Sequence, residues 1–391
     1  MASLCLVTKQ FLPHARSNLY YRPISSMPFT WDRALNFAAS LSSCNGQLVR
    51  SLEGIVALVS KIGEIAQAPS SLPFQLRGYT KTFSLYYSIL ASCPHLLHVE
   101  LIFNSSSHLK KLKALEASNS TRKTVKFTNP IPVPDYHLTD QLVHAALRHE
   151  MLQNIENLHL ENLVFKSPGL LSTEPLTPIP LSTCHIKSRY IAFEQARAFL
   201  PQDISNLRNL HLEIGLFKDE AKLSRLLRYL PSTMQHIEII LNLGPVRAQP
   251  TLSEYEEIDK PPFPSELFSR FSNLRNLTLT GHYLTPQLLE VLSTASPHLA
   301  HLNLFESRWV ASDLSTTIRY PSYISGILDP AQATSLLNTF KRLETVHLGF
   351  LPTIGRGRYA SLEGEMRRKG IDLDWEECED ARYCGFCGYV H

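Results

Sequence analysis

A short hydrophobic phrase recurs along the chain: an apolar residue, two spacers, and then Leu-x-Leu or a close variant. Its clearest copies are IENLHLENLVF (155–165), LRNLHLEIGLF (207–217), LRNLTLTGHYL (274–284) and LAHLNLFES (299–307). In weaker copies Ile, Val or Met replaces Leu: LLHVELIF (96–103), MQHIEIILNL (234–243) and LETVHLGFL (343–351). The alternation places both apolar side chains on one face of a strand. The pattern therefore predicts a series of short strands, each with one buried face.

The spacing of these strands is typical of leucine-rich repeats. The last apolar residues of adjacent copies are 27 residues apart from Leu212 to Ile239 and 25 apart from Leu279 to Leu304, inside the usual range of about 20 to 29. Larger gaps indicate inserted or degenerate repeats, for which plausible strands are VRSLEGI (49–55), TVKFTNP (124–130), LSTCHIK (181–187) and a closing GIDLDWE (370–376). We expect roughly ten or eleven strands.

Helices are predicted between the strands. DEAKLSRLLRYLPS (219–232) and TPQLLEVLSTASPHL (285–299) carry apolar residues at three-and-four spacing, and Thr285 followed by Pro286 is a typical helix start. One repeat cannot bury its own leucines, so neighbouring repeats must stack. The expected fold is an α/β leucine-rich-repeat solenoid (horseshoe) over residues 24–376, with a parallel sheet on the concave face and helices outside.

The repeats are irregular at three places. Pro, Ser and Thr are frequent in 167–183 and Pro in 244–264, whereas 306–334 contains RWVASDLSTTIRYPSY. All three ranges are predicted to be loops that leave the stack. Long loops on a rigid scaffold often carry recognition residues, although neutral variation also gathers in such insertions.

The residues between the paired leucines form a candidate binding surface, because their side chains point away from the core. With the next outward residues, the predicted partner-binding set is Glu100, His159, Glu161, His211, Glu213, Glu238, Thr278, Asn303 and His347. The histidines also suggest a metal site. Strands are about 4.8 Å apart, which separates His159 from His211 by about 10 Å, whereas zinc ligands converge within about 3 to 4 Å. A solvated or partner-contacting face is therefore favoured.

Composition narrows the class of protein. A hydrophobic share of 44% with 19% charged residues is that of a folded chain, and a net charge of +3 over 391 residues does not predict nucleic-acid binding. Cys5, Cys44, Cys93 and Cys184 are widely scattered and no apolar run could span a bilayer, so we expect a cytoplasmic or nuclear protein without a membrane segment. The acid-free first 31 residues leave a mitochondrial transit peptide as an alternative.

The C-terminal tail, 377–391, contains the only grouped cysteines. Cys378, Cys384, Cys387 and His391 form a C-x5-C-x2-C-x3-H arrangement that suggests a zinc knuckle. A strong zinc signal would have two regular pairs. A capping or frayed tail is therefore favoured, with no metal or other cofactor.

Signatures of common enzymes are missing from the sequence. GRGR (355–358) lacks the spacing of a phosphate loop and is predicted to be a short basic turn, and neither G-x-S-x-G nor H-E-x-x-H occurs. We therefore expect no catalytic residues and no enzymatic activity.

The N-terminal segment LCLVTKQFLPHARSNLYYRP (4–23) resembles the second half of an F-box. The matching positions include Leu4, Leu6, Val7 and Phe11, which the resemblance implies as contacts to the Skp-family linker of cullin-RING ubiquitin ligases. Fungal F-box/leucine-rich-repeat proteins have the same order, with the motif leading into the repeats. The first half of the motif is not found, so residues 1–23 are described as a partial, N-terminally truncated F-box or as the helical cap of the solenoid.

The sequence thus supports two hypotheses. In the first, the chain is a protein-binding leucine-rich-repeat protein that serves as an F-box-type substrate-recognition subunit of a cullin-RING ubiquitin ligase. In the second, it is a stand-alone interaction scaffold that does not bind the ligase linker. In both, the target is a protein of unknown identity.

Overall fold

A computed structural model describes residues 31–42, 45–52, 85–102, 123–128, 138–148, 152–165, 179–188, 191, 193–214, 220–241, 264–309, 328–351 and 356–377. These residues fall into two compact units, one within Met1–Leu181 and Pro201–Asp203 and the other within Ser182–Leu200 and Ile204–His391. We call them unit 1 and unit 2. None of the described helices is both long enough and apolar enough to cross a membrane.

Unit 1 contains three parallel strands in the order β1, β2, β4, which are His98–Ile102, Thr124–Thr128 and Asn157–Glu161. A second small sheet pairs β3 (Leu138–Thr139) with β5 (Leu163–Val164). Its described helices include α3 (Trp31–Ser42), η1 (Asn45–Leu48) and α7 (Asp140–Leu147), and residues 85–91 are also helical. In place of the expected strand at 49–55, the described residues show one parallel bridge between Ser51 and His98.

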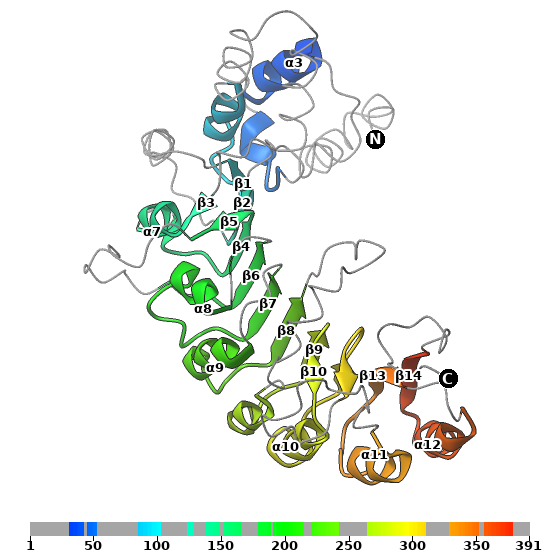
Figure 1. Ribbon diagram of the computed structural model, residues 1–391. Helices are drawn as coiled ribbons and strands as arrows, with labels where there is room; N and C mark the ends of the chain where they lie inside the picture. Colours follow the sequence, from blue (N-terminus) through cyan, green and yellow to red (C-terminus); the bar gives the residue numbers. More distant parts are fainter. Residues whose placement is uncertain are drawn as a thin grey trace, which may run out of the picture. The chain divides into compact units, whose positions relative to one another are not determined.

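Unit 2 contains seven parallel strands that follow one another in sequence order. They are β6 (Thr183–Ser188), β7 (Asn209–Ile214), β8 (His236–Leu241), β9 (Asn276–Thr280), β11 (His301–Asn303), β13 (Thr345–Leu351) and β14 (Asp372–Glu377). The connecting helices are α8 (Phe193–Ala196), η3 (Arg197–Phe199), α9 (Glu220–Tyr229), η5 (Ser265–Arg270), α10 (Gln287–Ala295), α11 (Pro330–Leu337) and α12 (Arg356–Arg368). Helices α8 to α12 all lie on one side of these strands (Figure 1).

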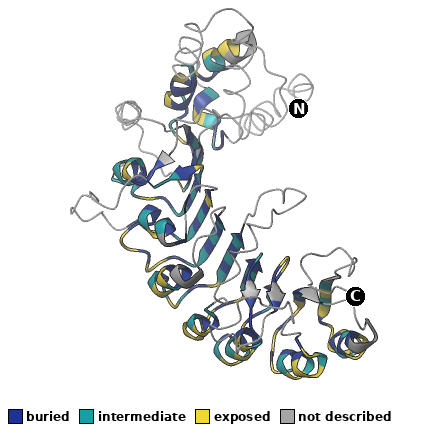
Figure 2. Ribbon diagram, in the orientation of Figure 1, coloured by how far each residue is buried: buried dark blue, intermediate teal, exposed yellow. Residues whose placement is uncertain are grey.

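The strand leucines build the core, as the Leu-x-Leu pattern predicts. In β7, Leu210, Leu212 and Ile214 are buried, whereas the residues between them are partly exposed, and Figure 2 shows this alternation along the strands. The buried side chains face the helices, so each repeat contributes to a core shared with its neighbours. The described residues contain ten such parallel strands, three in unit 1 and seven in unit 2. The predicted leucine-rich-repeat solenoid fold is confirmed.

A left-handed residue follows the long strand in several repeats and turns the chain into a second, short strand. Asn162 (φ 55°) precedes β5, Gly281 (φ 80°) precedes β10 (Tyr283–Leu284), and Glu306 (φ 54°) precedes β12 (Arg308–Trp309). Gly349 (φ 73°) occupies the corresponding place inside β13, where the register with β14 shifts. Strand β10 pairs in parallel with β12, and β12 with β13, so the short strands after these turns also pair from one repeat to the next.

Buried polar side chains satisfy the backbone at these turns. Ser307 donates from Oγ to the Leu279 carbonyl at 2.8 Å and accepts from the His282 amide at 3.1 Å. Trp309 donates from Nε1 to the Leu348 carbonyl at 2.8 Å. Because a buried, unpaired backbone group is costly, these bonds fix the path between the long and short strands.

Several element boundaries differ from the sequence prediction. Helix α10 begins at Gln287 with Pro286 in the capping position, one residue later than expected. The range 306–334 was expected to be a loop, but it contains β12 and the beginning of α11, which Asp329 caps by accepting from the Gln332 amide. GRGR at 355–358 was predicted to be a turn, and this is wrong from Arg356 onward, where α12 begins. Residues 1–23 and 378–391 lie outside the described part of the chain.

Candidate functional site

The side chains between the strand leucines of unit 2 form one continuous row. Strand pairing aligns His211 with Glu238, Glu238 with Thr278, Thr278 with Asn303, and Asn303 with His347. The row extends to His185 on β6 and to Asp374 on β14. We call these seven residues the polar strip; they alternate with buried or half-buried strand residues and so lie on the face opposite the core, whereas α8 to α12 are all on one side of the strands (Figure 1).

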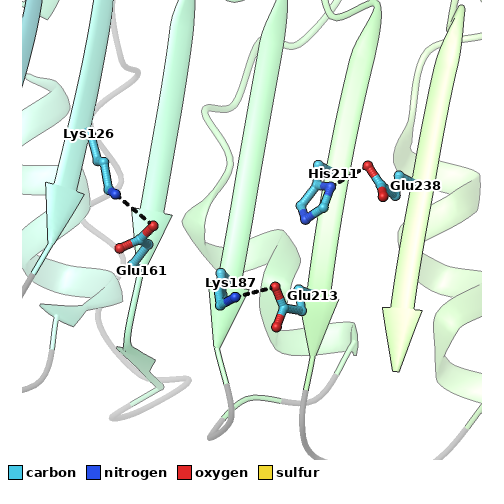
Figure 3. Close-up of polar contacts among 6 residues, drawn as sticks. All are labelled: Lys126, Glu161, Lys187, His211, Glu213 and Glu238. Atoms are coloured by element: carbon cyan, nitrogen blue, oxygen red, sulfur yellow. Dashed lines mark hydrogen bonds and ion pairs between the residues drawn. The ribbon is translucent and has the colours of Figure 1, made fainter. Parts of the chain in front are cut away.

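Unit 1 has an equivalent row on its own three strands. Glu100 is paired in register with Lys126, and Lys126 with His159. Lys126 Nζ lies 2.9 Å from Glu161 Oε1, as Figure 3 shows, and 3.9 Å from Glu100 Oε1. The lysine thus joins two predicted site residues, Glu100 and Glu161, and its charge offsets theirs.

Ion pairs also join neighbouring strands at the β6–β8 end of unit 2 (Figure 3). Lys187 Nζ lies 2.6 Å from Glu213 Oε2, and His211 Nδ1 is hydrogen-bonded to Glu238 Oε2. The His185 and His211 rings are in contact, with centroids 3.8 Å apart. Partly buried, mutually paired side chains hold a fixed shape, so this end of the strip is preorganised.

A second row of small polar side chains runs along the start of the strands. Asn209 donates from Nδ2 to Thr183 Oγ1 at 3.1 Å, and in unit 1 Asn157 donates in the same way to Thr124 Oγ1 at 3.2 Å. Farther along unit 2, His301 Nδ1 lies 2.9 Å from Thr345 Oγ1. These cross-strand bonds repeat with the fold, which indicates that they stabilise the strands rather than mark one ligand site.

Sequence reasoning missed several side chains of this face, among them Lys126, His185, Lys187 and Asp374. Their strands lack Leu-x-Leu: β2 buries Val125 and Phe127, and β6 buries Cys184 and Ile186. The strands themselves were predicted as degenerate repeats, but their outward residues were not assigned to the surface. The alternation of any β-branched, aromatic or cysteine residue at the expected spacing would have located them.

The carboxyl group of Glu238 has the clearest electrostatic perturbation on the strip. The hydrogen bond with His211 and the nearby imidazole of His236 lower its pKa to about 2, against the opposing effect of partial burial. His236 Nε2 lies 3.8 Å from the same carboxylate oxygen that His211 contacts. Two imidazoles on adjacent strands therefore hold this carboxylate in its ionised form.

We expect this pairing to give Glu238→Gln a pH-dependent effect on stability. The pKa of Glu238 is lowered by folding, so its contribution is present above the unfolded value near 4.3 and is lost as pH falls toward 2. The variant should unfold more easily than wild type by about 1 to 2 kcal/mol at pH 6, after allowance for solvent screening. Urea unfolding at pH 6, 4 and 3 would measure the difference. A difference that grows on acidification would contradict the assigned pairing.

The described residues contain no group of three or more His, Cys, Asp or Glu side chains placed to hold a metal ion. The weak zinc candidates Cys378, Cys384, Cys387 and His391 lie outside them. Cys93 and Cys184 are buried, and burial raises the pKa of each thiol to about 12. These two cysteines are protonated core residues at neutral pH.

Comparisons with known proteins add little to this geometry. No protein-family model matches the chain, and no curated protein does so either. Among solved structures, the chain is similar to the leucine-rich-repeat-containing protein LegL7 from Legionella pneumophila, with a TM-score of 0.32 and 13% identity over 75% of this chain and 87% of that one. Likeness at this level supports no inference about function, and the fold follows from the repeated units described above.

Proposed function

We propose that the chain is a non-enzymatic leucine-rich-repeat protein that binds another protein through the uncovered face of its strands. The register of the polar strip carries this proposal, because it aligns seven polar side chains on seven adjacent strands of one unit. Parallel strands hold such side chains at regular spacing with little freedom, which lowers the entropic cost of binding a partner.

We further propose that the chain is the substrate-recognition subunit of a cullin-RING ubiquitin ligase in the cytoplasm or nucleus. The support is the resemblance of residues 4–23 to the second half of an F-box. In this proposal Leu4, Leu6, Val7 and Phe11 contact the Skp-family linker, and the strand face selects the target. The alternative is a stand-alone scaffold that uses the same face without the linker.

Co-expression of the full chain with a Skp-family linker, followed by affinity and size-exclusion chromatography, distinguishes the ligase subunit from the stand-alone scaffold. We expect a stoichiometric complex with wild type, loss of the linker with Leu6→Asp/Val7→Asp, and an intact complex with Thr278→Arg on the polar strip. If the wild-type chain is folded but does not retain the linker, the ligase-subunit proposal is excluded and the stand-alone scaffold remains. Equal retention by wild type and the Leu6/Val7 variant would show that the linker binds elsewhere.

A further inference from the structure

Phe305 is exposed on the strand face, just beyond β11 of the polar strip. Leu302 and Leu304 are buried, so Phe305 points with Asn303 to the uncovered face, and it keeps 42% of its surface exposed. Its amide donates to Asn303 Oδ1 at 3.0 Å, which fixes the backbone beneath the ring. Phe305 lies in the turn that follows β11, and a large aromatic side chain held exposed in this way is a typical anchor for a partner.

A continuous chain of contacts leads from Phe305 across two further strands. The His347 ring on β13 meets Phe305 edge to face, with centroids 5.5 Å apart. His347 Nε2 lies 3.9 Å from Asp374 Oδ2 on β14. At the starts of these strands, His301 Nε2 lies 3.9 Å from Glu344 Oε2, and Asp372 is aligned with Thr345. We call His301, Phe305, Glu344, His347, Asp372 and Asp374 the Phe305 patch.

The charge of this patch differs from that of the β6–β8 end. There, Glu213 is paired with Lys187 at 2.6 Å and Glu238 with His211. In the Phe305 patch, the side chains of Glu344 and Asp374 are 70% and 79% exposed, and each has a histidine nitrogen at 3.9 Å; Asp374 Oδ1 also accepts from the Trp375 amide at 2.9 Å. The patch itself contains three carboxylates and no Lys or Arg; Lys341 and Arg342 are exposed in the turn before β13 and Lys369 in the turn before β14, at the strand starts and away from Phe305. Its field therefore favours a cation beside the aromatic ring.

We propose that the Phe305 patch docks an extended segment of a protein partner that carries arginine or lysine. One basic side chain lies over the Phe305 ring, and a second reaches the carboxylates of Asp372 and Asp374. Neighbouring strands are about 4.8 Å apart, so β11 and β14 are separated by about 10 Å, and Phe305 lies two residues beyond Asn303, which is level with Asp374. Phe305 and Asp374 are therefore about 12 Å apart, which an extended chain spans in about three or four residues, so the partner's basic residues are three or four positions apart. The inference rests on the proposed function, that this strand face binds protein.

Fluorescence anisotropy with the full chain and defined 12-residue peptides tests the proposal. The probe has two arginines three positions apart in a Gly/Ser/Ala background, and its counterpart has glutamates at those positions. We expect wild type to bind the arginine peptide at least about ten-fold more tightly, and more weakly as salt rises. Phe305→Ala and the double variant Asp372→Asn/Asp374→Asn should each weaken binding of the arginine peptide about three- to ten-fold. Glu290→Gln, an exposed carboxylate on α10, is the matched control and should bind as wild type.

The outcomes are distinguishable. Equal binding of both peptides, or an arginine preference that survives both patch variants, would overturn the proposal. An unchanged melting temperature in the variants shows that lost affinity is not lost folding, and Phe305→Leu, which keeps an apolar side chain, should recover only part of the binding. The proposed function is tested separately with a protein target. If Thr278→Arg releases that target but the patch variants retain it, the polar strip binds protein and the Phe305 patch is not the site for the basic segment.

Discussion

Replacement of Leu279 by Ala is expected to lower the free energy of unfolding by about 2 to 5 kcal/mol. Leu279 is fully buried on β9. It is aligned with Ile239 on the neighbouring strand β8, and the turn at Gly281 follows it along the chain. Truncation removes apolar contacts and leaves a cavity in a core that neighbouring repeats share, so the loss extends to adjacent repeats. Chemical unfolding of the full chain, followed by circular dichroism, would measure it.

Thr278→Ala is the matched control, because Thr278 lies next to Leu279 on the same strand but belongs to the polar strip. Its replacement should change the unfolding free energy by no more than about 0.5 kcal/mol. Similar destabilisation by the two variants would mean that the buried and open faces of β9 have been assigned incorrectly. Because a repeat array can unfold in more than one step, the two variants should be compared at the same transition.

The strand faces could be predicted because burial on one side imposes a period of two. Each strand can turn only one face to the core, the face that carries its leucine pair, such as Leu210 and Leu212 in β7. The residue between the leucines, His211 in β7 or Thr278 in β9, must then lie on the opposite face. The register between repeats follows because each strand presents an equivalent apolar pair to the shared core, whatever the length of the segment between them. For that reason the members of the row in unit 2 named from sequence, His211, Glu238, Thr278, Asn303 and His347, align in the structure.

The contacts of that face could not be predicted, because they depend on which residues of neighbouring strands meet. The pairing of His185 with His211 requires β6 to be adjacent to β7, although β6 has no Leu-x-Leu. The alternation with Leu302 and Leu304 is consistent with an exposed Phe305, but its contact with His347 depends on how β13 lies beside β11. The left-handed turn at Glu306, a non-glycine residue, is likewise not revealed by periodicity.

The repeat turn gives the second large effect: Gly349→Ala should destabilise the chain by about 2 to 4 kcal/mol. At Gly349 φ is +73°, which costs an L-residue about 1 kcal/mol or more. In addition, a Cβ atom would lie 2.5 Å from both the Leu304 and Ser307 carbonyl oxygens. Both are backbone atoms of the preceding repeat, and Ser307 is itself tied to Leu279, so they cannot move aside freely.

Two other glycines separate the contributions of backbone conformation and overlap. Gly370 has the same φ of +73° but no atom within 4 Å of a Cβ, so Gly370→Ala should cost about 1 kcal/mol. Gly364 lies inside α12 with open space around it, and Gly364→Ala should stabilise by about 0.5 to 1 kcal/mol through helix propensity. Equal losses at 349 and 370 would show that the Leu304 and Ser307 carbonyls yield. A larger loss at 349 would show that close approach of successive repeat backbones, beyond the left-handed turn alone, requires glycine there.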